Sequence, residues 1–414
     1  MRFLILGLNY LPESTSIGPY TADLAEYLVA KSHRVSVVTG FPMAPQWRIW
    51  EGYRNRLFMR QIVNGVPVLR TFLYVPSRPQ KSLNRILFDL SFAFSSFLGG
   101  LFVGSADLMI AISPPLQLGL TAWLLGRVKH SPFVLHLQDL VPDAAVATGM
   151  LCEESRAVRL ARKIERLVYG RACSVGVISE GFARNLETKG VPPSKIALLP
   201  NYIDLDFLKL MDRNNGFRKR FGIKADTFLV MYSGSIALKQ GLQTFVEAAA
   251  EFREADNVAF YLIGEGPYLG DLQSRAKELQ IGSLSFLPLQ SRESLPMQLS
   301  AADALVITQK RSVTDVVFPG KLLYYMAAER PILAAVSSDS ETGRFITKHQ
   351  AGIVVPPEEP KALAEAIRYL QNNKDEILRL GKNGRRVVEE QFDRRLVLKK
   401  FANHLEMLIE NKRN

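Results

Sequence analysis

Short apolar segments alternate with amphipathic helical segments along the first half of the chain. Residues 2–8 (RFLILGL) are apolar, residues 19–32 have helical spacing, and residues 34–40 are apolar and β-branched. This order predicts a βαβ unit with a right-handed crossover, and therefore a parallel sheet. Helical stretches separate most of the further predicted strands, which is typical of a doubly wound sheet. These strands are residues 66–72, 107–113, 133–139 and 174–179.

The same rhythm begins again after a loop near residue 200. A strand is predicted from residue 227, followed by a helix over residues 242–252. Two such halves predict an α/β protein with two Rossmann-like doubly wound domains that face each other across a ligand-binding cleft. The later strands are predicted at residues 258–266, 284–289, 304–308, 331–336 and 352–357. The expected domains are residues 1–203 and 204–390, with a C-terminal helix over 391–414 that crosses back to the first domain.

Positive charge is concentrated in the first half of the chain. The net charge is +12, and residues 1–200 hold 22 Lys and Arg against 13 Asp and Glu. Because these residues are scattered and no nucleic-acid motif is present, we expect phosphate or an anionic membrane surface rather than nucleic acid. Cys152 and Cys173 lack the spacing of a metal or redox pair and are predicted to be core thiols.

The most apolar window, residues 86–103, bears on membrane contact. Its eighteen residues are at the lower limit for spanning a bilayer, and Asp89 and a Gly99-Gly100 pair weaken it further. It fits either a helix packed within the first domain or a helix docked at a membrane interface. In the second interpretation, the basic residues that lead into this helix are Arg78, Lys81 and Arg85. The N-terminal apolar run is too short for a signal peptide, so a cytoplasmic protein is expected.

Two segments of the first half are candidate ligand contacts. Gly18, between the first strand and the first helix, lets the backbone approach a ligand closely. The GxG spacing of a dinucleotide fingerprint is missing there, which argues against an NAD-dependent dehydrogenase. Residues 136–143 (HLQDLVPD) place polar side chains at the carboxyl end of a predicted parallel strand, where such sheets bind ligands. His136 and Asp139 are therefore catalytic candidates, and a satisfied core histidine is the alternative for His136.

In the second half, glycines surround a candidate anion site. Gly234 and Gly241 bracket a loop in which Lys239 precedes a helix, so that its charge and the backbone N–H groups converge on phosphate oxygens. The alternative is a solvated lysine at a turn. Gly264 and Gly266 belong to a second turn that is too short for a phosphate loop.

Lys321 supplies a second candidate cation. It follows Pro319 and Gly320 in the first turn of a predicted helix, where positive charge opposes the helix dipole unless an anion is bound. A diphosphate would satisfy both this turn and the loop between Gly234 and Gly241.

Taken in order, these motifs resemble family 4 of the retaining GT-B glycosyltransferases, and within it a bacterial branch that acts in polysaccharide synthesis. The resemblance spans nearly the whole chain, from the Gly18 loop onward. The matching segments are residues 113–120, 136–149, 198–204, 233–242, 263–267, 300–308 and 319–333.

The resemblance implies transfer of a sugar from a UDP- or GDP-linked donor without a bound metal or other cofactor. The donor is a substrate held mainly by the C-terminal domain, and the acceptor lies on the N-terminal domain near Gly18 and residues 136–143. The acceptor hydroxyl attacks the face that the diphosphate leaves, with that diphosphate as base. The catalytic candidates are His136, Asp139 and Lys239. The candidate donor contacts are Gly18, Gly234, Ser235, Gln240, Gly241, Gly264, Gly266, Leu289, Pro319, Gly320, Lys321 and Tyr324.

The sequence departs from the family pattern at four positions. Ser235 and Gln240 occupy places that hold Arg and Lys in many relatives, and Val316 and Tyr324 occupy the places of two glutamates. These departures support one alternative, an inactive sugar-nucleotide-binding partner. The other alternative is a nucleotide-sugar epimerase of the same fold, against which the small number of histidines, five in 414 residues, argues. The expected acceptor is a saccharide, in particular a lipid-linked one, with peripheral contact to an anionic membrane.

Overall fold

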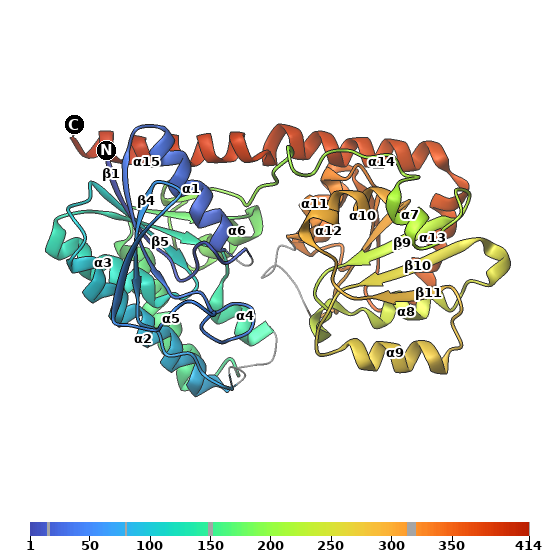
Figure 1. Cartoon of the computed structure of the whole chain (residues 1–414), viewed down its shortest axis with the longest axis horizontal. Helices are drawn as coiled ribbons and strands as arrows, with labels where there is room; N and C mark the ends of the chain where they lie inside the picture. Colours follow the sequence, from blue (N-terminus) through green and yellow to red (C-terminus); the bar gives the residue numbers. More distant parts are fainter. Residues whose placement is uncertain (15–16, 79–80, 148–151, 313–319, 414) are drawn as a thin grey trace. The chain divides into compact units, whose positions relative to one another are not determined.

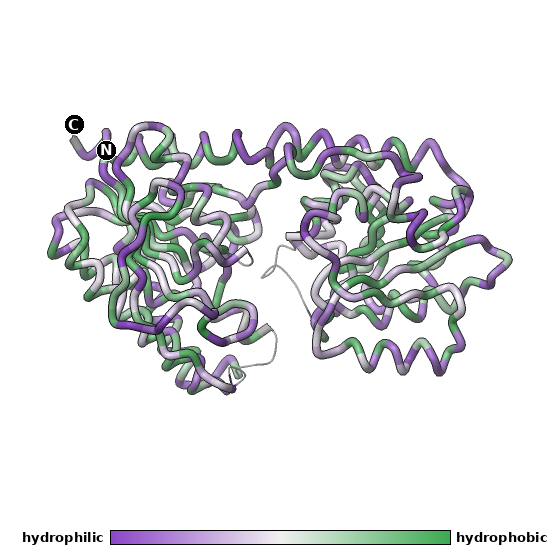
Figure 2. The backbone as a smooth tube through the Cα atoms, viewed as in Figure 1, coloured by the Kyte–Doolittle hydropathy of each residue, from purple (hydrophilic) through white to green (hydrophobic). Residues whose placement is uncertain are grey.

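The chain forms two α/β units, each with its own sheet and hydrophobic core (Figure 1). The computed structural model describes residues 1–414 except 15–16, 79–80, 148–151, 313–319 and 414. Unit 1 comprises Met1–Asn201 and Val397–Asn414, and unit 2 comprises Tyr202–Leu396. Figure 2 shows that hydrophobic residues concentrate along the strands inside each unit, as expected for sheets covered by helices on both faces.

Unit 1 contains an eight-stranded sheet with the order β3-β4-β2-β1-β5-β6-β7-β8. All strand pairs are parallel except β3 with β4. The chain winds outward from β1 in both directions, so the predicted doubly wound sheet is confirmed. The strands are β1 Arg2–Leu6, β2 Arg34–Gly40, β3 Phe58–Val63, β4 Val66–Thr71, β5 Leu108–Ser113, β6 Phe133–Leu137, β7 Ser174–Val177 and β8 Ile196–Leu198.

The helices of unit 1 bury one side against this sheet. In α1 the buried positions Thr21, Leu24, Ala25 and Leu28 follow the spacing of a single helical face. The helices are α1 Gly18–Ala30, α2 Ser82–Leu101, α3 Gln117–Lys129, α4 Val141–Ala147, α5 Arg156–Arg171, α6 Glu180–Thr188 and the 3-10 turn η1 Pro193–Lys195.

The β3–β4 hairpin is an element that the hydrophobic pattern did not predict. Its two central residues, Asn64 and Gly65, have φ of 49° and 80°. Positive φ at both positions is the signature of the tight turn that Asn-Gly favours. The hairpin adds an antiparallel edge strand to an otherwise parallel sheet.

Unit 2 contains a six-stranded parallel sheet with the order β11-β10-β9-β12-β13-β14. This is the order of a dinucleotide-binding sheet, whose ligand site lies at the carboxyl ends of the two strands on either side of the reversal. Here those strands are β9 and β12. The strands are β9 Phe228–Ser233, β10 Val258–Ile263, β11 Leu284–Leu287, β12 Ala304–Thr308, β13 Ile332–Ala335 and β14 Gly352–Val355.

Helices connect the strands of unit 2, and a helical tail follows the sheet. The helices are α7 Gly216–Arg220, α8 Gln243–Ala249, α9 Leu269–Glu278, α10 Leu295–Ala301, α11 Lys321–Ala327, α12 Glu341–His349, α13 Pro360–Asn372 and α14 Lys374–Val387. The short turns are η2 Leu238–Gln240, η3 Glu254–Asp256 and η4 Arg292–Ser294, and a π-helical turn spans Val388–Phe392.

The last helix, α15 Arg394–Arg413, belongs to unit 1 from Val397 onward. Glu406 on this helix accepts hydrogen bonds from Lys31 at 2.6 Å and from His33 at 2.8 Å. Farther back, His404 lies 3.0 Å from the hydroxyl of Ser174. The end of the chain is therefore fixed to the first unit by charged and polar contacts.

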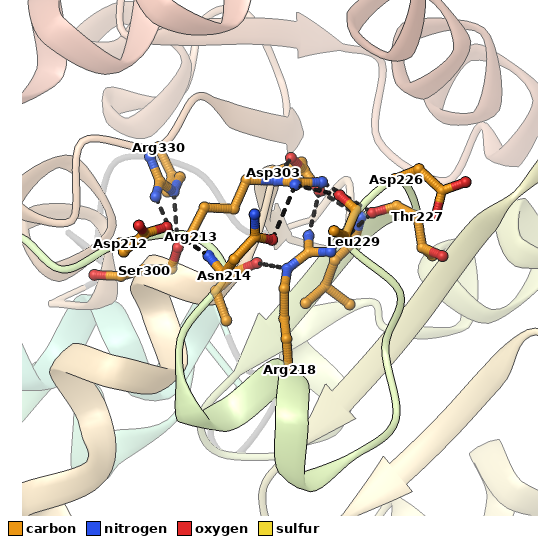
Figure 3. Close-up of polar contacts among 12 residues, drawn as sticks. Asp212, Arg213, Asn214, Arg218, Asp226, Thr227, Leu229, Ser300, Asp303 and Arg330 are labelled. Atoms are coloured by element: carbon orange, nitrogen blue, oxygen red, sulfur yellow. Dashed lines mark hydrogen bonds and ion pairs between the residues drawn. The ribbon is translucent and has the colours of Figure 1, made fainter.

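One carboxylate at the amino-terminal end of the second sheet holds several elements together (Figure 3). Asp303, just before β12, accepts hydrogen bonds from Arg213, from Arg218 at 2.6 Å and from the backbone N–H of Leu229 at 2.7 Å. Nearby, Arg330 donates to the carbonyl of Ser300 at 2.7 Å. The remaining guanidinium donors of Arg213 and Arg218 bind backbone carbonyls. The hydrogen-bonding groups of this cluster therefore have partners within the protein, which indicates a structural role.

The fold bears on two expectations from the sequence. The apolar window 86–103 lies largely in α2, with Phe88 and Phe92 buried against unit 1. Among the described residues, no helix combines the length and apolarity needed to cross a bilayer. The prediction of core thiols is wrong: Cys152 and Cys173 are free cysteines and both are exposed, because each lies in a connection beside a helix or strand end.

The contacts of Asp303 predict that removing its carboxylate greatly lowers the stability of unit 2. Replacing Asp303 with Ala leaves two arginines without their carboxylate, one of them buried, and should lower the free energy of unfolding of unit 2 by about 3–5 kcal/mol. Chemical denaturation followed by circular dichroism measures this. Asp375→Ala, at an exposed position in the first turn of α14, is the control and should cost at most about 1 kcal/mol. Equal losses in the two variants would contradict the assignment.

Candidate functional site

Two glycine turns pack against each other where β9 and β10 end. The N–H of Gly234 donates to the carbonyl of Ile263 at 2.9 Å, and that of Ile236 donates to Glu265 at 2.9 Å. A Cβ on Gly264 would lie 1.9 Å from the carbonyl oxygen of Gly234, and one on Gly266 would lie 2.0 Å from that of Ile236. Both glycines also have φ above 150° but below 160°. Only glycine allows this approach of two backbones.

The second part of the same loop is fixed to the end of β12. The carbonyl of Lys239 accepts from the N–H of Lys310 at 3.2 Å, and that of Gln240 accepts from the hydroxyl of Thr308 at 2.5 Å. Gly241 follows in the left-handed conformation, with φ of 59°. The backbone at Lys239 is therefore held at the switch point while its side chain is exposed.

Lys321, the first residue of α11, extends toward this loop. Its ammonium group donates to the hydroxyl of Tyr232 and lies 3.8 Å from the centroid of the Tyr232 ring. The Tyr232 hydroxyl in turn donates to the carbonyl of Ser235 at 2.6 Å. A Cβ at Gly234 would lie 3.1 Å from the ammonium nitrogen. Tyr232 thus positions the lysine against the glycine turn.

The ammonium group of Lys321 lies in an unfavourable electrostatic environment. Burial, reinforced by the nearby charge of Lys239, lowers the pKa of Lys321 to about 7. Among the residues that the structure describes, no carboxylate forms an ion pair with it. Within the described part of the chain, therefore, Lys321 and Lys239 lie at the carboxyl end of one sheet without an ion-pair partner, an arrangement that an anion would stabilise.

Tyr325 is a site residue that the sequence analysis missed. Its hydroxyl accepts from the N–H of Ser233 at 2.9 Å and donates to the carbonyl of the same residue at 3.0 Å. Tyr325 lies one helical turn after Lys321 on α11, and its hydroxyl fixes the end of β9. The predicted contact Tyr324 instead feels the charges of Arg292 and Asp204, while burial raises its pKa.

The other predicted residues of unit 2 are spread more widely. Ser235 is exposed in the glycine loop, and Gly320 is the N-cap of α11. Leu289 is exposed beyond the edge strand β11, two strands away from β9. Val316 and Pro319 lie outside the described residues.

In unit 1, His136 lies within the core of the protein. Its Nε2 atom is 3.1 Å from the carbonyl oxygen of Leu199, and its ring packs edge-on against Phe401. Burial lowers the pKa of His136 to about 4, so the ring is neutral at physiological pH. The neighbouring polar residue Gln138 accepts from Asn201 at 2.8 Å. This geometry favours the alternative of a satisfied core histidine.

Two further candidates in unit 1 have different surroundings. Gly18 begins α1, and a Cβ there would lie 3.0 Å from the carbonyl oxygen of Glu13, so tight loop packing accounts for the glycine. Asp139 is half-buried between β6 and α4. Asp143, in the same motif, forms an ion pair with Lys189 at 2.7 Å.

The described residues contain no group of three or more His, Cys, Asp and Glu side chains placed to hold a metal. The expectation that no metal is required remains a prediction.

Comparison with known proteins connects these features to a family. The family described as glycosyl transferase 4-like domain matches residues 15–202, and glycosyl transferases group 1 matches residues 214–387. The putative colanic acid biosynthesis glycosyl transferase WcaI of Escherichia coli K12 is 31% identical over 98% of this chain and 100% of its own length.

Solved structures show the same fold. Sucrose-phosphate synthase from Thermosynechococcus elongatus has a TM-score of 0.74 at 19% identity and covers 99% of both chains. HepE of Anabaena, crystallised with UDP-glucose, has a TM-score of 0.69 at 17% identity, over 98% of this chain and 100% of its own.

The contact between the glycine turns predicts opposite effects of two Gly→Ala substitutions. Gly264→Ala forces a methyl group into the Gly234 carbonyl and should lower the free energy of unfolding by roughly 2 kcal/mol or more. Gly270→Ala, inside α9 with open space around its Cα, should raise it by up to about 1 kcal/mol. Denaturant titration of both variants measures the two changes in the free energy of unfolding. A Gly264→Ala variant as stable as the wild type would show that the two glycine turns need not be this close.

Proposed function

This chain belongs to family 4 of the retaining GT-B glycosyltransferases, and on that premise we propose that Lys321 and Lys239 bind the diphosphate of its nucleotide-sugar donor. The chain is a glycosyltransferase whose relatives act in the synthesis of bacterial cell-surface polysaccharides. The donor and its contacts in unit 2 are the part that we propose.

The observation that carries this proposal is the half-buried ammonium group of Lys321. Its contacts with Tyr232 orient it but supply no full negative charge. A diphosphate at the ends of β9 and β12 would supply that charge, and backbone N–H groups of the glycine loop would add donors. UDP-linked sugars are the first donors to test, because HepE, which shares the fold, was solved with UDP-glucose.

In the proposed reaction, the bond between the anomeric carbon and the diphosphate oxygen breaks as a bond to the acceptor hydroxyl forms on the same face. The acceptor proton passes to the departing diphosphate, so no protein nucleophile is needed. Negative charge develops on the oxygen atoms of the departing diphosphate. In this proposal the protonated ammonium group of Lys321 stabilises that charge. Tyr232 is a positioning residue that keeps the ammonium group in place.

We propose a lipid-linked saccharide as acceptor, used at the cytoplasmic face of the cell membrane. The excess of basic residues in the first 200 residues supports this choice, because anionic lipids line that surface. A soluble saccharide acceptor is the alternative, and product analysis with both acceptor types distinguishes them.

Substitution of the two lysines tests the donor site. Lys321→Met preserves the bulk of the side chain but removes its charge, and should lower kcat/KM about 100-fold or more, as expected for a lost charge contact in the transition state. Lys239→Met should have a smaller effect, about tenfold, because Lys239 is exposed. The readout is release of nucleoside diphosphate in the presence of acceptor.

Lys277→Met, on the exposed face of α9, is the matched control and should leave turnover unchanged. Unchanged turnover in Lys321→Met would contradict the assignment of the donor site. Absence of turnover in the wild-type protein with every donor and acceptor would favour an inactive binding partner.

A further inference from the structure

A pocket of about 510 Å³ lies in unit 1, between α5 and the chain that connects α6 to β8. A pocket of this volume can hold a small organic ligand. Two of its lining residues, Gly170 and Lys195, lie just before the amino-terminal ends of β7 and β8. Doubly wound sheets bind the ligands of their reactions beyond the opposite, carboxyl ends. The pocket is therefore part neither of the donor site proposed in unit 2 nor of the carboxyl edge of the first sheet.

A buried carboxylate supplies the acceptor group of this pocket. Glu165, only 3% exposed, accepts hydrogen bonds from the hydroxyl of Tyr169 at 2.6 Å and from the ammonium group of Lys189 at 2.8 Å. Lys189 also pairs with Asp143 of α4 at 2.7 Å, which fixes the position of its ammonium group. Because a carboxylate has about four acceptor positions, Glu165 can also accept from hydroxyl groups of a ligand.

Basic side chains in the same pocket lack matching negative charge. The lining contains four of them against one carboxylate. Lys195 donates to the carbonyl of Gly170 at 2.8 Å, and burial lowers its pKa. Arg162 pairs with Glu153 at 2.8 Å, but that carboxylate is 62% exposed and its charge is screened by solvent.

Arg166 completes this set on α5. Among the residues that the structure describes, no carboxylate forms an ion pair with it. Arg166 and Lys195 come from separate segments and line one pocket. An anionic group placed between them would supply the negative charge that both side chains lack.

We infer that this pocket binds an anionic sugar, with Arg166 and Lys195 on its phosphate or carboxylate group and Glu165 on its hydroxyl groups. Val191 and Pro192 line the same pocket and suit the C–H face of a sugar ring. A bare phosphate ion fits less well, because the carboxylate would repel it and would gain no hydroxyl partner. The inference goes beyond the proposed function and does not depend on it.

Titration calorimetry of the full chain with glucose 6-phosphate and with glucuronic acid tests this pocket and distinguishes the two anionic groups. The wild-type protein should bind at least one of them, and should bind glucose and inorganic phosphate at least tenfold more weakly. Arg166→Met and Lys195→Met should each lower the affinity for the anionic sugar about tenfold, as expected for the loss of one charge-assisted hydrogen bond.

Two further lysine substitutions serve as controls. Lys163→Met removes an exposed charge from α5 that does not line the pocket, so its affinity should equal that of the wild type. Lys321→Met, in the proposed donor site, should still bind the anionic sugar while it loses stabilisation by UDP. Thermal denaturation without ligand shows whether each variant is folded.

The outcomes separate this inference from the proposed function. Weaker binding of the anionic sugar in Arg166→Met and Lys195→Met, with stabilisation by UDP intact, supports the inference. Equal affinity for glucose and both anionic sugars, or anionic-sugar binding that only Lys321→Met weakens, overturns it. Inorganic phosphate that binds as tightly as glucose 6-phosphate would also overturn it, because the sugar would then contribute nothing. Failure of UDP to stabilise any of the proteins would count against the donor site alone.

Discussion

The contact between the ammonium group of Lys321 and Tyr232 determines the electrostatic character of the donor site that we propose in the second unit. Removing an ammonium group from water costs free energy unless a counter-charge replaces the lost hydration. Tyr232 offers a hydroxyl oxygen and the negative face of its ring, which orient the group but do not neutralise it. The lowered pKa of Lys321 reflects this shortfall. The lack of a side chain at Gly234 leaves room for the ammonium group, and Tyr325 holds the end of β9.

Cationic side chains have different surroundings at the two ends of the sheet in unit 2. At the amino-terminal end, Arg213 and Arg218 share Asp303, and their other donors reach backbone carbonyls. At the carboxyl-terminal end, Lys321 and Lys239 have no such partner among the described residues. The first arrangement stabilises the fold, whereas the second is the one that we propose a bound diphosphate completes. This contrast follows the rule that parallel sheets bind ligands beyond the carboxyl ends of their strands.

The sequence predicted the repeated strand and helix pattern, because buried parallel strands are near-continuous apolar runs and their helices have one apolar face. It did not predict the β3–β4 hairpin, although Asn64-Gly65 carried the turn signal. Lys321 could be singled out because a lysine in a first helical turn opposes the dipole. Tyr232 and Tyr325 could not, because both lie in apolar segments and only the packing of β9 against α11 brings their hydroxyls to the loop. For His136 the structure favours the alternative of a core histidine, and the sequence could not decide this because the partner of its ring, the carbonyl of Leu199, is distant in sequence.

Proton uptake on UDP binding, measured by titration calorimetry in buffers of different ionisation enthalpy, tests the central claim most directly. If the free Lys321 has a pKa near 7 and a bound diphosphate restores its charge, binding at about pH 8 takes up close to one proton. The same titration with Lys321→Met should take up close to none. Equal proton uptake by the two proteins would contradict the assignment of Lys321 to the diphosphate.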